Sequence, residues 1–401
     1  MKKIALFVVL FVFAGSLLIA QPACTKDVIY TLVSLKQIPK ARKMMEENCF
    51  PGNESSADVW LVRGNVFIQL HEYELDRQSD PKYVVKWPDA IVIANESFYK
   101  AMELNKDIKP VTGLMGPKDG QVLSADPINK MALEAMKNEN YAEALKLLNL
   151  VVRSYKVDPK EYALYLAYAY TDLATCHKAM GDEANYKKIL LDAAKLNAPD
   201  PFIYLSIYDI YKQEKDTVKC GEILNQARKI IPDSLALDVK GYELDYLAMI
   251  GDTVKLKSAA INLFEQNKKN IEVITMVATH LINNKEYTLA EEMLQTGLTT
   301  APNKFELNQL MGYRFNCEAL DYVKLKEDKL NEKPRKYTEA EAALNKSNEF
   351  FRLALPWAEK AYNINNDDRD NNIMLSRIYA RLIMDIPAEL NEKVNSYNKK
   401  Q

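Results

Sequence analysis

Two stretches of this chain, residues 201–232 and 271–302, align with each other without a gap. In the first half of each stretch, apolar residues recur at spacings of four and three, which places them on one face of an α-helix. In the second half, small residues take helical spacing, and a proline ends the stretch. Each stretch therefore predicts two helices joined by a short turn. The equivalent pairs are Tyr204 and Ile274, Tyr208 and Ala278, Tyr211 and Leu281, Cys220 and Ala290, Leu224 and Leu294, Ala227 and Gly297, and Pro232 and Pro302.

This arrangement resembles the tetratricopeptide repeat (TPR), which has large and small apolar positions on its first helix, small positions on its second helix, and a period of about 34 residues. Small residues let the two helices approach each other closely. One helical pair cannot bury its apolar face alone, so successive pairs must stack. The resemblance implies an all-α, superhelical α-α solenoid of about nine TPR-like helical hairpins.

The composition agrees with a helical fold. The chain is 48% hydrophobic and has only 12 glycines among 401 residues. It lacks the Gly- and Asn-rich turns between alternating apolar strands that indicate a sheet. The net charge of −2 gives no indication of nucleic-acid binding.

The first twenty residues indicate export. Lys2 and Lys3 precede an apolar stretch at 4–19, and Ala20 followed by Gln21 is a plausible cleavage point. This pattern is typical of a secretory signal peptide and predicts a location in the periplasm or cell envelope. The alternatives are an uncleaved membrane anchor and a lipoprotein acylated on Cys24.

Export places the cysteines in an oxidising compartment. Cys24 opens the first predicted helix and Cys49 closes the second, so the two ends are neighbours in an antiparallel hairpin. We therefore predict a Cys24–Cys49 disulfide, with two unpaired thiols as the alternative. Cys176, Cys220 and Cys317 lie inside predicted helices and are expected to be buried free thiols.

The array is predicted to be interrupted in three places. Residues 108–125 contain three glycines and two prolines, which indicates a linker. Two charged insertions, at about 75–88 and 321–347, either form loops or lengthen helices. The expected parts are a signal peptide at 1–20, an N-terminal TPR-like module at 21–107, a linker at 108–125, a central TPR array at 126–303 and C-terminal TPR-like units at 304–401.

No sequence motif supports an enzyme. The three histidines lie on separate predicted helical pairs, and no nucleophile, phosphate-binding or zinc-binding spacing occurs. We therefore predict no catalytic residue, no metal site and no cofactor.

Three predicted turns carry the triplets Asp216-Thr217-Val218, Asp233-Ser234-Leu235 and Asp252-Thr253-Val254. They favour helix N-capping by the polar side chains. They also resemble the Asp-Ser/Thr-apolar O-glycosylation motif of Bacteroidetes envelope proteins, and both interpretations stay open.

The TPR resemblance implies that first-helix side chains line a concave binding face. That face lacks the Lys/Asn/Arg clamp of chaperone-binding TPR proteins, and its middle is acidic. The expected function is a non-enzymatic protein–protein interaction scaffold that binds a protein or peptide; the alternatives are a structural subunit of an envelope assembly and a glycan- or peptide-capturing protein that uses exposed aromatics. The expected partner-binding residues are Tyr168, Thr171, Thr175, Lys178, Asp209, Lys212, Asp238, Asp245, Thr275 and Thr279.

Overall fold

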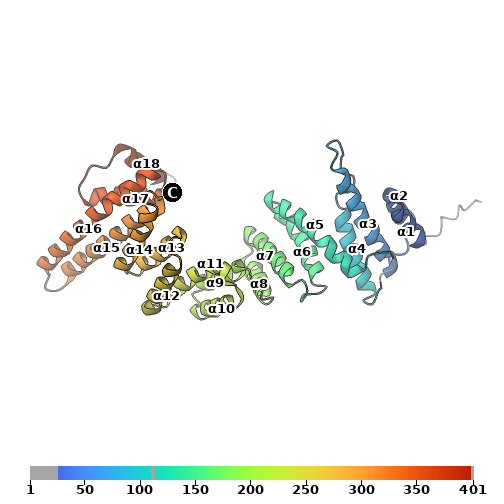
Figure 1. Ribbon diagram of the computed structural model, residues 1–401, viewed down its shortest axis with the longest axis horizontal. Helices are drawn as coiled ribbons and strands as arrows, with labels where there is room; N and C mark the ends of the chain where they lie inside the picture. Colours follow the sequence, from blue (N-terminus) through green and yellow to red (C-terminus); the bar gives the residue numbers. More distant parts are fainter. Residues whose placement is uncertain (1–25, 110–112, 399–401) are drawn as a thin grey trace, which may run out of the picture. The chain divides into compact units, whose positions relative to one another are not determined.

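The computed structural model describes residues 26–109 and 113–398. Within these residues all regular structure is helical, and 18 α-helices follow one another as nine antiparallel pairs (Figure 1). The predicted all-α fold of about nine TPR-like hairpins is therefore confirmed. We call the first helix of each pair helix A and the second helix B.

The chain divides into two compact units between residues 203 and 204. Unit 1 contains four pairs, and each helix B also contacts the next helix A from α4 to α7. Its helices are α1 (Lys26–Ser34), α2 (Ile38–Met44) with a π-helical turn η1 (Met45–Cys49), α3 (Ala57–Arg77), α4 (Ala90–Leu104), α5 (Pro117–Lys137), α6 (Tyr141–Tyr155), α7 (Ala163–Ala179) and α8 (Glu183–Ala194).

Unit 2 contains five pairs, counting α9, whose first residues precede the division. Consecutive A helices contact each other from α11 through α13 and α15 to α17. Its helices are α9 (Pro201–Gln213), α10 (Thr217–Ile230), the 3-10 turn η2 (Asp233–Leu235), α11 (Leu237–Met249), α12 (Thr253–Gln266), α13 (Ile271–Asn283), α14 (Tyr287–Thr300), α15 (Phe305–Asn331), α16 (Tyr337–Ile364), α17 (Arg369–Arg381) and α18 (Ala388–Asn398).

Small residues permit the closest helix contacts in both units. In unit 1, the fully buried ring of Phe98 on α4 lies between Gly64 of α3 and Gly120 of α5. A Cβ atom would come within 2.8 Å of this ring at Gly64 and within 2.4 Å at Gly120. In unit 2, a Cβ at Gly312 of α15 would lie 3.2 Å from the backbone nitrogen of Ala358 on α16. These glycines therefore set how closely neighbouring helices pack.

The predicted linker at 108–125 is wrong in its second half, because α5 begins at Pro117. Proline is compatible with the first turn of a helix, where its missing N–H has no partner to lose. Gly120 is a packing position against Phe98, and Ala125 is buried in the core of unit 1. The predicted boundary between an N-terminal module and a central array therefore falls inside unit 1, where α4 packs on α5.

Six of the nine turns within the described helical pairs follow one pattern. The residue two positions before the start of helix B has a positive φ, as at Gly181, Lys215 and Gly251. The side chains of Asp216 and Asp252 then accept hydrogen bonds from the backbone N–H groups of Lys219 and Lys255. The N-capping interpretation is confirmed for these two triplets. It is wrong for the third, because Pro232 precedes the 3-10 turn that begins at Asp233.

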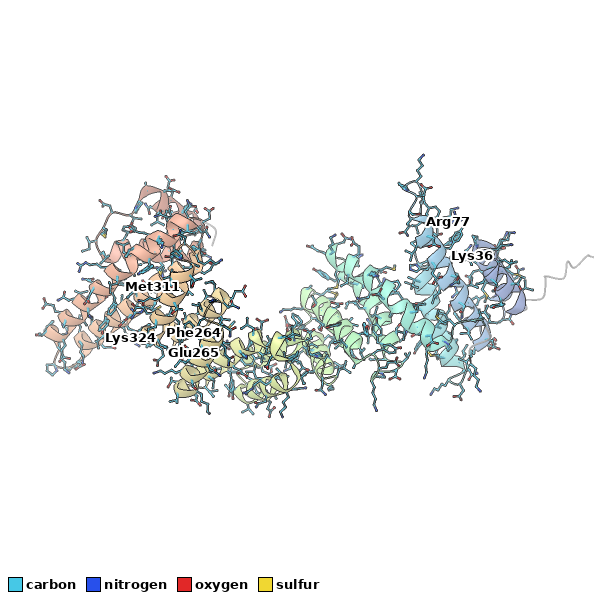
Figure 2. All side chains as sticks on the ribbon, in the orientation of Figure 1. Lys36, Arg77, Phe264, Glu265, Met311 and Lys324 are labelled. Atoms are coloured by element: carbon cyan, nitrogen blue, oxygen red, sulfur yellow. The ribbon has the colours of Figure 1, made fainter. Side chains whose placement is uncertain are left out.

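The first charged insertion is a loop fastened to its helix. Glu74 of α3 is only 2% exposed, although it carries a carboxylate. It accepts a hydrogen bond from the Tyr83 hydroxyl at 2.8 Å and another from the Lys86 backbone nitrogen at 2.9 Å. Figure 2 shows Arg77 at the end of α3, where this loop begins.

The second charged insertion lengthens both helices of its pair. Helix α15 has 27 residues and α16 has 28, and α16 continues through Pro356. Lys324, labelled in Figure 2, is exposed on the lengthened part of α15, whereas Met311 near its start is fully buried. Pro356 therefore lies inside a continuous helix.

The cysteines lie as expected, with one exception. Cys176 and Cys220 are buried free thiols, whereas Cys317 is a free thiol of intermediate exposure. Cys49 is fully buried at the end of η1. Cys24 and the predicted signal peptide lie outside the described residues, so the Cys24–Cys49 pairing stays a prediction. No helix within 26–109 and 113–398 combines the length and the apolar character needed to cross a bilayer.

Replacing Gly120 with Ala is expected to destabilise unit 1 by about 1–3 kcal/mol, because the new methyl group would overlap the Phe98 ring. Thermal unfolding followed by circular dichroism measures the effect. Lys118→Ala, at an exposed position of the same helix, should change stability by less than about 0.5 kcal/mol. The loss of stability in the double variant Phe98→Leu with Gly120→Ala should differ from the sum of the losses in the two single variants. Equal stability of Gly120→Ala and wild type would contradict the close approach.

Candidate functional site

The A helices of unit 2 share one register. Counted from the first residue of each A helix, the ninth residues occupy equivalent positions. We call this set the central column of unit 2. From α9 to α17 it consists of Asp209, Asp245, Thr279, Tyr313 and Arg377. Its chemistry therefore changes along the unit from carboxylate to guanidinium.

Asp245 of α11 is bound within the protein by two groups of α9. The buried Tyr208 donates its hydroxyl proton to Asp245 at 2.8 Å, and the Lys212 ammonium lies 2.7 Å from the same carboxylate. Burial and the hydrogen bond to Asp245 together raise the pKa of Tyr208. Two of the predicted site residues, Lys212 and Asp245, thus neutralise each other.

Asp209 has a similar partner. The Tyr242 hydroxyl of α11 donates to its carboxylate at 3.0 Å. Burial, followed by the nearby Asp209 charge, raises the pKa of Tyr242 to about 12. The rings of Tyr208 and Tyr242 meet edge to face, 5.1 Å apart. The sequence indicated an acidic middle of this face, but part of that charge is engaged in contacts between α9 and α11.

The other predicted residues of unit 2 lie on the same helices. Asp238 is exposed in the first turn of α11. The hydroxyls of Thr275 and Thr279 on α13 donate to the backbone oxygens of Glu272 and Thr275. These threonines offer half-buried methyl groups and hydroxyls already occupied within their own helix.

The remaining predicted residues lie on α7 in unit 1. The hydroxyls of Thr171 and Thr175 bond within α7, and the ammonium of Lys178 lies 5.0 Å from the ring centroid of Tyr186. Tyr168 is 48% exposed. Tyr165, three residues earlier on the same helix, is 56% exposed and stacks on Tyr155. Exposed aromatics on α7 are compatible with the capture of a ring-bearing ligand.

A groove of about 960 Å³ lies between α15 and α17, with Phe351 of α16 contributing to its wall. It includes two members of the central column, Tyr313 and Arg377. The sequence prediction missed this groove. The residues that line it are Gln309, Leu310, Tyr313, Asn316, Cys317, Leu320, Phe351, Asp370, Asn371, Ile373, Met374, Arg377, Ala380 and Arg381.

The two ends of the groove differ in charge. Near the start of α17, Gln309 donates to Asp368, which caps the helix by accepting from the Asn371 backbone nitrogen. At the end of α17, Arg377 and Arg381 are exposed and form no ion pair with any residue in 26–109 or 113–398. The groove therefore offers two guanidinium groups that the described chain leaves uncompensated.

Two titratable groups of the groove are held in their protonated forms. Burial raises the pKa of the Cys317 thiol, which favours its unreactive protonated form. Burial first, and then a hydrogen bond with Cys317, raises the pKa of Tyr313 to about 12. Across the described part of the chain, no group of three His, Cys, Asp or Glu side chains could hold a metal ion.

The comparisons with known proteins find similar folds only. No protein-family profile and no curated protein matches the sequence. A chain from the structure of Naa15/Naa10 bound to HypK-THB is 15% identical with a TM-score of 0.33; the match covers 94% of this chain but only 58% of that one. Yeast Tom70 is 11% identical with a TM-score of 0.37, over 93% of this chain and 87% of its own.

A TPR repeats protein from Bacteroides fragilis is 13% identical with a TM-score of 0.25, over 78% of this chain and 98% of its own. The present chain thus spans less than two thirds of the Naa15/Naa10 chain. Matches with TM-scores this low carry no argument about function.

Asp245→Ala is expected to lower stability by about 1–3 kcal/mol, because it leaves the buried Tyr208 hydroxyl without its acceptor. Asp238→Ala removes an exposed carboxylate from the same helix and should change stability by less than about 0.5 kcal/mol. Urea unfolding of both variants tests the difference. Equal effects would mean that the α9–α11 contact is not formed as described.

Proposed function

We propose that this chain is an exported, non-enzymatic protein-interaction scaffold that holds a segment of a partner protein in the groove between α15 and α17. The observation that carries the proposal is the groove itself, which two A helices build from apolar and uncompensated charged side chains. Concave, largely apolar sites with a few polar groups are where proteins bind ligands.

The size of the groove suits a peptide segment. A volume of about 960 Å³ can accommodate several residues of an extended chain, and both ends of the groove carry polar side chains. The α9–α11 part of the unit 2 face is less suited to this role, because Asp245 and Lys212 already bind each other. We therefore place the main contact at α15 and α17.

The location of the protein is part of the proposal. The basic start, apolar stretch and Ala20–Gln21 cleavage point support export to the periplasm or cell envelope. A Cys24–Cys49 disulfide would form there and would hold the first helical pair, which has only nine and seven residues in its α-helices.

Site-specific photo-crosslinking in the native host tests the function. A photoreactive phenylalanine analogue at Ile373, in the groove, is expected to crosslink one predominant polypeptide, which should then bind the purified protein. The matched position is Glu292, exposed on helix B α14, where we expect no crosslink. Labelling at 292 equal to that at 373, or binding that survives blocking of the groove, would argue against this function.

Cell fractionation and thiol labelling test the location. The periplasmic protein should begin at Gln21, and without reduction its denatured form should be alkylated only at Cys176, Cys220 and Cys317. After reduction all five cysteines should react. In the control variant Cys24→Ser, Cys49 should also react without reduction. Recovery in the cytoplasm with residues 1–20 attached would contradict export.

A further inference from the structure

The basic end of the α15–α17 groove presents two exposed guanidinium groups, those of Arg377 and Arg381. Arg377 and Arg381 are one helical turn apart, so their guanidinium groups share one face of α17. Neither is paired within the described residues, whereas the buried Arg314 on neighbouring α15 pairs with both Glu291 and Glu318. Guanidinium groups bind carboxylates through paired, charge-assisted hydrogen bonds.

The rest of the groove presents apolar surface beside one buried amide. Leu310, Leu320 and Met374 contribute apolar surface. Asn371, which also lines the groove, is fully buried; its amide nitrogen donates to the Ala358 oxygen, but its own oxygen accepts no hydrogen bond from any described residue.

Two exposed apolar residues follow the arginines in the chain, outside the groove lining. Helix α17 ends at Arg381, and the next residues include Ile383, which is 94% exposed, and Met384, which is 45% exposed. Ile383 has a φ of 57°, a left-handed conformation that is strained for a β-branched side chain. A segment that ended at the arginines would leave this apolar turn uncovered. A segment that continued past them could cover it.

We propose that the groove binds an internal acidic segment of a partner, in which side-chain carboxylates meet Arg377 and Arg381 while apolar residues on either side occupy the groove and contact Ile383. This inference rests on the proposed function and specifies its ligand. Charge complementarity identifies the carboxylates, and the exposed turn beyond Arg381 places them inside the segment instead of at a chain end.

A displayed library of random twelve-residue peptides, selected against the purified mature protein, tests the proposal. Selected peptides should carry Asp or Glu next to apolar residues. Neutralising those acids to Asn or Gln in synthetic copies should weaken binding at least tenfold, whereas amidating the peptide C-terminus should change it less than twofold. Binding should also weaken as salt concentration rises.

Variants of the protein supply the matched controls. Arg377→Gln with Arg381→Gln should weaken binding at least tenfold without changing the unfolding temperature, because both side chains are exposed. Arg335→Gln with Arg352→Gln removes two arginines from outside the groove lining and should leave binding unchanged. Ile383→Gly should raise the unfolding temperature by relieving strain, yet weaken binding several-fold. A purely structural role of Ile383 would not lower affinity.

The results distinguish a failure of the acidic-segment proposal from a failure of the proposed function. Peptides that bind the groove but are neutral or basic, or that require a free C-terminal carboxylate, would overturn the inference and leave the proposed function standing. If no selected peptide can be crosslinked at position 373, the groove is not a binding site and both proposals fail.

Discussion

The packing of this protein depends on the close approach of helices at residues without a side chain. Phe98 fits between α3 and α5 because Gly64 and Gly120 present bare backbone to the two sides of its ring. Gly312 lets α15 lie against the backbone of α16 in the same way. Since protein interiors are packed as densely as crystals, an added methyl group at such a point must move a whole helix. The spacing of the A helices, and so the face they present, follows from these contacts.

On the face of unit 2, side-chain pairing decides which charges a partner can reach. Asp209 and Asp245 are bound by hydroxyl and ammonium groups from the neighbouring helix. The partly exposed Lys212–Asp245 ion pair by itself adds little to stability, about 0–1 kcal/mol. Their larger effect is on specificity, because a carboxylate held by Lys212 attracts a basic ligand only weakly. Arg377 has no such partner among the described residues, so the α17 end of the central column carries an accessible positive charge, whereas Asp209 at the opposite end is exposed but already accepts the Tyr242 hydroxyl.

The sequence predicted the helical pairs well because their signal is repeated. Apolar spacing, small residues and a terminal proline recur in register, and each repetition reinforces the others. The start of α5 was missed because proline and glycine occur both in turns and within helices. Pro117 can begin a helix, and only the contact with Phe98 shows that Gly120 is a packing residue. Local patterns cannot distinguish these readings, since the deciding atom lies on another helix.

The groove was missed for a related reason, although a signal was available. Tyr313 and Arg377 are the ninth residues of α15 and α17, the same register that led to Asp209, Asp245 and Thr279. The lengthened α15–α16 pair separates them in the sequence and hides the repeat period. The engagement of Asp245 could not be foreseen either, because it depends on which side chains of α9 reach across to α11.

The turn after α17 shows most clearly that stability alone does not explain this region. Gly181 and Gly251 occupy left-handed positions in other turns, where glycine is free of strain. Ile383 takes the same kind of position at a cost of about 1–3 kcal/mol, since its branched Cβ crowds the backbone. It gains almost nothing from burial, because 94% of its surface is exposed. The segment proposed above would cover this exposed side chain and bury its apolar surface.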